Sequence, residues 1–329
     1  MKRTLLVAAL ATLASSAALA QSSVTIYGRL NLTVEQTELN GRKLKVENNN
    51  ASRLGFKGTE DLGGGLRAGF QLEHGFSPDT GLPSSSSFWN RQSEVNLSGG
   101  FGTVRLGNFI SEAYFATSDY IGMHNHETGD SSDALYAYLG RSTNKVAYRT
   151  PEFVKGLTLE GAVSASEGGG RIRHYDVAGN WQIGALHLGL GYEKAGNAAV
   201  PTKQYAVSAL YEFGSFILGG MVQRDTDGYS NGVTKIGDRT NFRVSAAYNL
   251  GQSEFHLNVG SAGKYSKLAD SSARQFTLGY NYNLSKRTKI YGYYTKIDDN
   301  KAGLYTGGPR GAGREGEFSA LAAGIRHNF

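Results

Sequence analysis

The chain has 329 residues, with 34 Lys and Arg against 28 Asp and Glu, a formal charge of +6, and no cysteine. Without cysteine it can contain neither a disulfide framework nor a thiolate metal site. Its basic residues are scattered along the chain instead of clustered with aromatic platforms, which argues against a nucleic-acid-binding protein.

Residues 1–20 have the organisation of a secretory signal. Lys2 and Arg3 precede a short apolar run at 5–13, and the small-residue site at 18–20 is typical of signal cleavage. We expect residues 21–329 to form one mature domain, whose charge falls to +4 once Lys2 and Arg3 are removed. No other stretch approaches the roughly 18 apolar residues of a membrane-spanning helix, so a membrane crossing must use strands.

The first mature segment, residues 24–36, alternates strictly between two kinds of side chain. The apolar set is Val24, Ile26, Leu30, Leu32 and Val34, with Gly28 among them. The polar set is Thr25, Tyr27, Arg29, Asn31, Thr33 and Glu35. A period of two places the sets on opposite faces of a β-strand. Periodicity alone is compatible with a soluble sandwich or with a membrane barrel.

Seven short turns rich in Gly, Ser or Asn follow along the chain. They lie at 61–66, 97–102, 150–156, 181–186, 211–216, 248–253 and 282–287. Each turn joins two alternating segments, and the first segment and the last, residues 316–329, bring the expected number of strands to sixteen. An even number of antiparallel strands closes a barrel with both chain ends on one side.

Three features favour an outer-membrane barrel over a sandwich. The polar faces are crowded with charges and amides, as at Asn241, Arg243, Ser245 and Asn249, which suits a water-filled lumen. Aromatic residues gather beside the short turns, where a membrane-interface girdle falls. The opposite connections are long and polar: 37–51, 77–89, 110–142, 226–238 and 299–315.

The third of these connections is unusually long. Turn centres lie roughly 30 to 37 residues apart, except for an interval of roughly 53 that contains residues 110–141. This insertion is acidic. Its acidic residues are Glu112, Asp119, Glu127, Asp130 and Asp133. Loops of this length in compact domains are usually functional or disordered.

Five segments resemble the general diffusion porins of β-proteobacteria, related to the anion-selective porins of Comamonas and Bordetella and to neisserial porins. They are SSVTIYGRLNL (22–32), SRLGFKGTEDLGGGLRAGFQLE (52–73), FGTVRLG (101–107), LSKRTKIYGYY (284–294) and GIRHNF (324–329). The resemblance implies a sixteen-stranded, usually trimeric barrel in outer-membrane lipid and lipopolysaccharide, whose third long loop folds inward and narrows the lumen. It also implies that Phe329 is part of a C-terminal signal read by the outer-membrane assembly machinery.

A water-filled pore selects by diameter and by the charges that line it. From the alternation, the basic side chains expected to face inward are Arg29, Arg53, Lys57, Arg67, Lys145, Arg149, Arg243, Lys289 and Arg326, while the facing of Arg91 is ambiguous. The acidic side chains expected to face inward are fewer: Glu35, Glu73, Asp176 and Glu254. An excess of cationic charge concentrates anions, so we expect a weak to moderate anion preference.

The residues expected to form the constriction combine the alternation with the resemblance. The basic set is Arg29, Arg53, Lys57, Arg91, Lys145 and Arg149, opposed by the acidic residues of the third loop. Arg53 is the best match to the family's basic cluster, and Arg91 is a weaker match. Asn108 and Ala147 stand where related chains often carry Arg, so the strength and sign of selectivity are left open.

Other functions receive less support from the sequence. A channel specific for phosphate, sulfate or small organic acids is an alternative, although the charges look distributed instead of convergent. A surface adhesin that uses the external loops is compatible with the same barrel. His124 and His126 with Glu127 and Asp130 form only a weak metal pattern. No nucleophile elbow or triad is visible, so we expect neither catalysis nor a cofactor.

Overall fold

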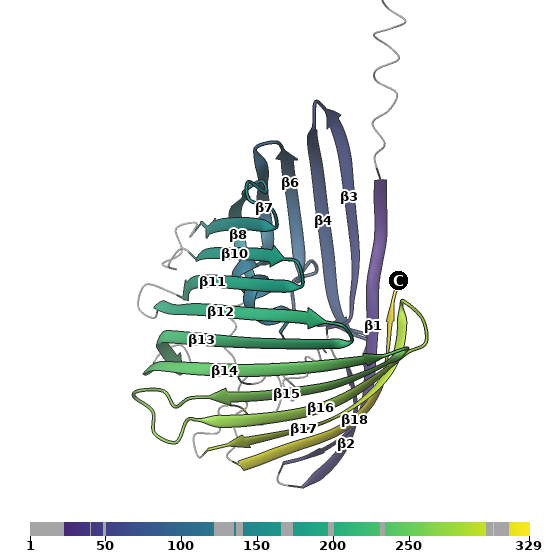
Figure 1. Cartoon of the computed structure of the whole chain (residues 1–329), viewed down its shortest axis with the longest axis vertical. Coiled ribbons are helices and arrows are strands. Elements are labelled where there is room, and N and C mark those ends of the chain that lie inside the picture. The colour runs from purple at the N-terminus through teal and green to yellow at the C-terminus, as the bar shows by residue number, and fades with distance from the viewer. Residues whose placement is uncertain are drawn as a thin grey trace, which may run out of the picture.

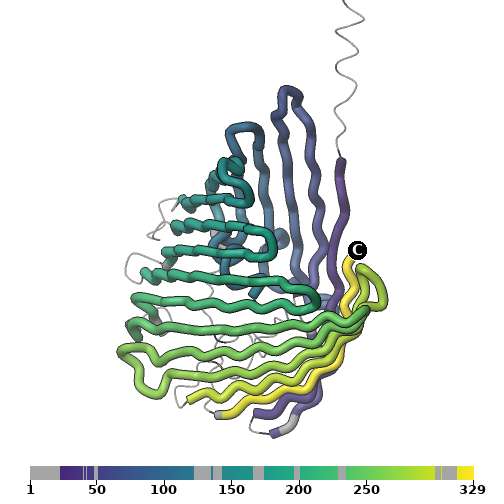
Figure 2. The backbone as a smooth tube through the Cα atoms, in the orientation of Figure 1, coloured from purple at the N-terminus to yellow at the C-terminus, as the bar shows by residue number. Residues whose placement is uncertain are grey.

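The computed structural model describes residues 23–39, 41–48, 51–121, 135, 141–165, 174–196, 201–230, 234–300, 305 and 316–329. The expected signal segment, residues 1–20, lies outside the described residues, as do Glu127, Asp130 and Asp133 of the third loop. Antiparallel strands follow one another around the molecule, and Figure 2 traces the chain through successive hairpins.

Most of the strands are labelled in Figure 1. The first nine are β1 (Ser23–Glu38), β2 (Arg42–Asn48), β3 (Arg53–Gly63), β4 (Leu66–Ser77), β5 (Leu82–Pro83), β6 (Gln92–Gly99), β7 (Gly102–Ile110), β8 (Arg141–Arg149) and β9 (Leu157–Ser164). The others are β10 (Tyr175–Ile183), β11 (Leu186–Gly196), β12 (Pro201–Phe213), β13 (Phe216–Ser230), β14 (Thr234–Leu250), β15 (Ser253–Ala262), β16 (Ala273–Asn283), β17 (Thr288–Asp299) and β18 (Gly316–Asn328).

The expected count of sixteen is confirmed for the described part of the chain. Strands β2 and β3 both pair with β1 and together form one interrupted barrel strand, while β5 pairs with the external end of β4. Pairing of β1 with β18 closes the ring. The closure extends to Phe329, whose backbone N–H donates to the Gly28 carbonyl at 3.1 Å and whose carbonyl accepts from Gly28 at 3.0 Å.

The distribution of apolar and polar side chains in the barrel is the inverse of that in a soluble protein. On β1 the apolar residues Val24 and Leu30 are 66% and 41% exposed, whereas the alternating Asn31, Thr33 and Glu35 are buried. Aromatic residues of β12 to β16 form a continuous row beside the short turns. Their ring contacts run through Tyr211, Phe213, Phe216, Tyr248, Phe255 and Tyr280. An apolar outer face with an aromatic girdle suits lipid, and the polar inner face suits water.

All seven expected short turns join consecutive barrel strands, but two of the expected long connections are wrong. Residues 37–51 belong mainly to β1 and β2, which pair as far as Glu38 and Arg42. Residues 226–238 belong mainly to β13 and β14, which pair as far as Ser230 and Thr234. Polar composition does not end a strand whose backbone pairing with its neighbour continues. Among the described residues, no helix is long and apolar enough to cross a membrane.

Candidate functional site

The third external loop leaves the barrel wall at a defined break in β7. Gly107 has a φ of 142°, and the register with β8 shifts between Gly107 and Phe109. Such a bulge redirects the chain, and the left-handed backbone favours glycine. The Ser111 hydroxyl then accepts from the Tyr114 N–H at 3.1 Å and caps a short helix, α2 (Glu112–Tyr114), which continues into the π-helical turn η1 (Phe115–Asp119).

This helical segment lies inside the barrel against β10, β11 and β12. A Cβ on Gly189 would stand 1.6 Å from the Ala116 carbonyl oxygen, so only glycine allows the approach. Ala113 and Ala116 pack with Ala178 of β10. The Ser208 hydroxyl on β12 donates to the Ala116 carbonyl at 3.1 Å. Small side chains on the inner wall thus form the seat of the loop.

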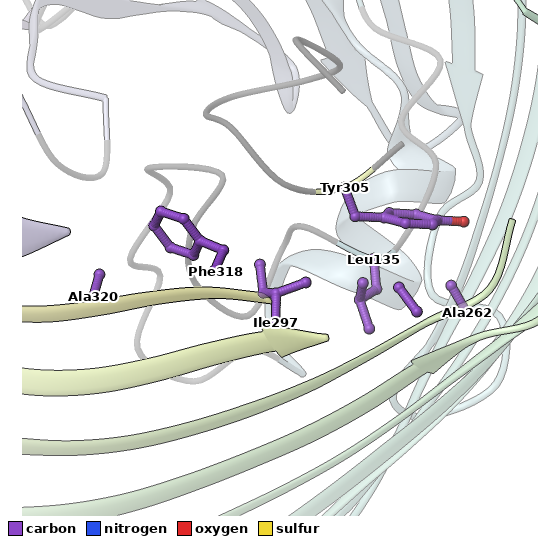
Figure 3. Packing of buried hydrophobic residues seen from close by; sticks show 7 residues of the cluster. Leu135, Ala262, Ile297, Tyr305, Phe318 and Ala320 are labelled. Carbon is purple, nitrogen blue, oxygen red and sulfur yellow. The ribbon is translucent and has the colours of Figure 1, made fainter. Parts of the chain in front are cut away.

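The same loop also contacts a second part of the wall. Leu135 packs in an apolar cluster with Ala262 of β15, Ile297 of β17 and Tyr305 of the last external connection (Figure 3). The Tyr305 hydroxyl accepts from Arg239 of β14. The described residues of the third loop are therefore held at two separated places inside the barrel, which confirms the expected inward fold for residues 111–121 and 135.

Charged groups fasten the beginning of the loop to the wall, and we call this group the loop clamp: Arg105, Arg149, Glu94, Glu112 and Glu160. Arg105 bonds Glu94 at 2.8 Å and both carboxylate oxygens of Glu160 at 3.0 and 3.1 Å. Glu112 lies 2.7 Å from Arg149 and 3.6 Å from Arg105. Bidentate and shared contacts of this kind are geometrically specific.

Burial raises the pKa of Glu112. The guanidinium groups of Arg149 and Arg105 oppose this shift, whereas the carboxylates of Glu160 and Asp176 reinforce it. The carboxyl of Glu112 therefore takes up a proton at a higher pH than an ordinary glutamate does.

Lys145 is fully buried beneath the same loop. Its ammonium group forms an ion pair with Asp176 and lies 4.7 Å from the centre of the Phe109 ring, while the Arg105 guanidinium lies 4.2 Å from that centre. Lys145 and Arg149, both expected at the constriction, thus contact acidic partners at the base of the loop.

A different group, which we call the basic wall, comprises Arg29, Arg53, Lys57, Arg91, Lys289 and Arg326. Register places Arg29 opposite Arg53 and Arg326 opposite Lys289, so their side chains share the inner face with Lys57. Arg91 lies just before β6 and reaches that face, where its guanidinium contacts Glu73 at 2.6 Å. Arg53 lies 3.9 Å from the same carboxylate.

The basic wall lies across the barrel from the seat of the third loop. The strand order places β11 half-way round the ring from β1, and β10 and β12 half-way from β18 and β3. Lys57 is exposed, with its ammonium 5.3 Å from the centre of the Tyr27 ring. Register places Arg67 and Arg243 on the inner face as well. The inner face across the barrel from the loop therefore has a group of cationic side chains.

The sequence prediction missed Arg105, Glu94 and Glu160. All three occupy the polar positions of alternating strands, in TVRLGN, SEVNL and LTLEGAV, so the period of two indicated that their side chains face inward.

Ala147 lies directly opposite Arg105, and the Asn108 side chain donates to the Trp89 carbonyl at 3.3 Å. Asp119 lies in η1.

The expected acidic row of the loop is only partly described. Glu112 belongs to the loop clamp, and Glu127, Asp130 and Asp133 lie outside the described residues. In the part that the structure covers, no three His, Cys, Asp or Glu side chains are placed to share a metal ion. His124 and His126 lie outside that part.

A closed barrel with an apolar exterior, a polar interior and an inserted loop defines the class of membrane channels. A family model described as Gram-negative porin matches residues 6–302. The chain belongs to the Gram-negative porin family. It is thus an outer-membrane channel for passive diffusion.

Individual relatives agree over the full length. The chain is 33% identical to outer membrane porin protein 32 of Delftia acidovorans and 27% identical to an outer membrane porin protein of Bordetella pertussis, with 100% of each chain covered in both comparisons. Among solved structures, the anion-selective porin from Comamonas acidovorans matches with a TM-score of 0.77 and 28% identity, covering 94% of this chain and 100% of that one. These relatives are porins, which form channels and are not enzymes.

Proposed function

We propose that this porin is a general diffusion channel with a weak to moderate preference for anions. The observation that carries the proposal is the basic wall across the lumen from the third loop. Arg53 and Arg91 share the carboxylate of Glu73, while Arg29, Lys57 and Arg326 lie on the same inner face. The anion selectivity named for the Comamonas porin supports the same assignment.

The mechanism is electrostatic and needs no chemical step. Cationic side chains beside a narrow aqueous path lower the energy of an anion there and raise that of a cation, and the low-dielectric wall strengthens the effect. Lys145 and Arg149 contribute less, because Asp176, Glu112 and Glu160 offset their charges at short range. We therefore assign selectivity to Arg29, Arg53, Lys57 and Arg91, and loop positioning to the loop clamp. No catalytic role is proposed.

Membership of the porin family supports a proposal for export and assembly. The proposal includes cleavage of residues 1–20, a single mature barrel domain at 21–329, and assembly as a homotrimer in lipid and lipopolysaccharide. We propose a role for Phe329 in insertion of the barrel into the outer membrane. Its backbone pairs with Gly28 and so helps to close the ring of strands. The assembly machinery is proposed to read this terminal strand.

The test is ion selectivity of the purified porin in planar bilayers. Under a KCl gradient, we expect a reversal potential whose sign reports preference for chloride over potassium. A potential of the opposite sign would contradict the assignment of the basic wall. Conductance that saturates at low phosphate concentration would instead favour the phosphate-specific channel.

A further inference from the structure

Phe115 is an anomaly in the distribution of apolar side chains. Among the described residues, the other large apolar side chains with high exposure lie on the outer face, in the short turns or in the 78–91 connection. Phe115 is 42% exposed, yet it belongs to η1, which is seated inside the barrel. Exposure of an aromatic ring to water in the lumen is unfavourable, and the packing of the loop against the wall does not bury this ring.

The packing of the helical segment fixes which side Phe115 occupies. Ala113 and Ala116 are buried against the wall, close to Gly191 and Gly189 of β11. Phe115 is not part of that seat; its ring makes an edge contact with Tyr114, with 5.7 Å between the centroids. Because β11 lies half-way round the ring from β1, the passage beside Phe115 has the basic wall on its other side.

An apolar aromatic surface and a cationic surface therefore face one aqueous path. We infer that this pair forms a weak subsite for amphipathic organic anions, namely carboxylates that carry an aromatic ring. The ring packs on Phe115, and the carboxylate is attracted to the basic wall, chiefly Arg29, Arg53 and Lys57. Ring–ring contact adds to the area buried, while an inorganic anion can use only the charges. The inference rests on the proposed anion preference and adds a substrate class to it.

Block of chloride current by phenylacetate tests the subsite in the complete porin. We expect phenylacetate to reduce single-channel chloride conductance at lower concentration than acetate does. Substitution Phe115→Ser should raise the phenylacetate concentration for half-block about two- to tenfold, the range of one aromatic contact. Phe115→Trp should keep the native value. Phenethylammonium, with the opposite charge, should not block.

The matched control is Phe88→Ser, because Phe88 is another exposed phenylalanine, 66% exposed in the 78–91 connection. Its half-block concentration should equal that of the native porin. Equal block by phenylacetate and acetate in the native channel would overturn the subsite, as would an unchanged value in Phe115→Ser. The KCl reversal potential of the same channels reports the general anion preference separately. A chloride-selective potential with no phenylacetate effect therefore contradicts the subsite alone.

Discussion

The two sides of the lumen use similar charged residues in different ways. At the base of the third loop, Arg105 and Arg149 contact three glutamates, and Lys145 contacts Asp176, so positive and negative groups offset each other at short range. On the basic wall, Arg53 and Arg91 share Glu73. We propose that the same residue types stabilise structure on one side and set the electrostatic potential of the passage on the other.

The difference lies in the balance of charge and not in burial, because the side chains of Arg53 and Arg91 are 19% and 16% exposed whereas that of Arg149 is 37% exposed. Beneath the loop, cations meet several carboxylates, and the buried Lys145 is tolerated because it is paired with Asp176. On the basic wall, two arginines share one carboxylate and Lys57 is exposed. Composition alone cannot separate these cases, because the net charge of the chain sums over both.

The strongest way to break the loop clamp is Arg105→Ala. The substitution leaves Glu94 and Glu160 without their shared guanidinium, and loss of one partner of a buried ion network typically costs about 3 to 5 kcal/mol. We expect a lower midpoint of urea unfolding in detergent and unstable single-channel current. Arg67→Ala is the matched control, because Arg67 is an inward-facing but exposed arginine. An equal loss of stability in both variants would contradict a special role for Arg105.

The far end of the loop is tested by Leu135→Ala. Leu135 is buried in the apolar cluster with Ala262, Ile297 and Tyr305 (Figure 3), and its truncation should cost about 2 kcal/mol. We expect the barrel to persist, since its backbone pairing is unaffected, while current noise and subconductance events increase. Leu135→Met should restore quiet channels, because it preserves most of the volume. Noise that is unchanged in Leu135→Ala would show that this contact does not hold the loop.

The period of two was sufficient to predict the strands, the seven turns and the inward facing of Arg29 and Arg53. Each of these depends on residues adjacent along the chain. The same alternation marks Arg105, Glu94 and Glu160 as inward, but their partnership depends on the register of β6, β7, β8 and β9. Residues 105 and 160 are far apart in sequence, and only the pairing of strands brings them together.

The seat of the third loop was also beyond the sequence prediction. The residues that contact the loop are Gly189, Gly191 and Ala178, and they occupy inward positions of strands where a polar residue is expected. The neighbouring sequence does not distinguish a small residue that packs against a loop from a small residue that faces water. The expected boundaries of residues 37–51 and 226–238 were wrong because the backbone pairing of β1 with β2 and of β13 with β14 continues through these polar stretches.

Arg53→Glu tests the basic wall. At about 8 Å and the dielectric constant of water, one unit charge changes the energy of an ion by about 0.5 kcal/mol. Charge reversal therefore raises the energy of chloride and lowers that of potassium by about 1 kcal/mol each, which should shift the chloride-to-potassium permeability ratio towards cations by at most about thirtyfold. Arg149→Gln should shift it less, because this substitution removes one unit charge whereas Arg53→Glu changes the charge by two units. The measurement is the reversal potential under a KCl gradient at low salt, where screening is weak. A larger shift for Arg149→Gln would reverse the roles assigned to the two sides.

The smallest expected effect is a pH dependence of selectivity that originates in Glu112. Burial raises the pKa of this carboxyl, so acidification protonates Glu112 before an ordinary glutamate. Protonation removes one negative charge from beside Arg149 and Arg105, and the lumen becomes more cationic. The chloride preference should therefore increase as the pH falls from neutral, by less than about twofold for one partly screened charge.

Glu112→Gln should already have at neutral pH the chloride preference that the native porin reaches in acid, and it should lose this part of the pH dependence. Glu38→Gln, a change on the outer face, should behave as the native porin. A pH dependence that persists unchanged in Glu112→Gln would place the titrating group elsewhere and leave the loop clamp as a purely structural device.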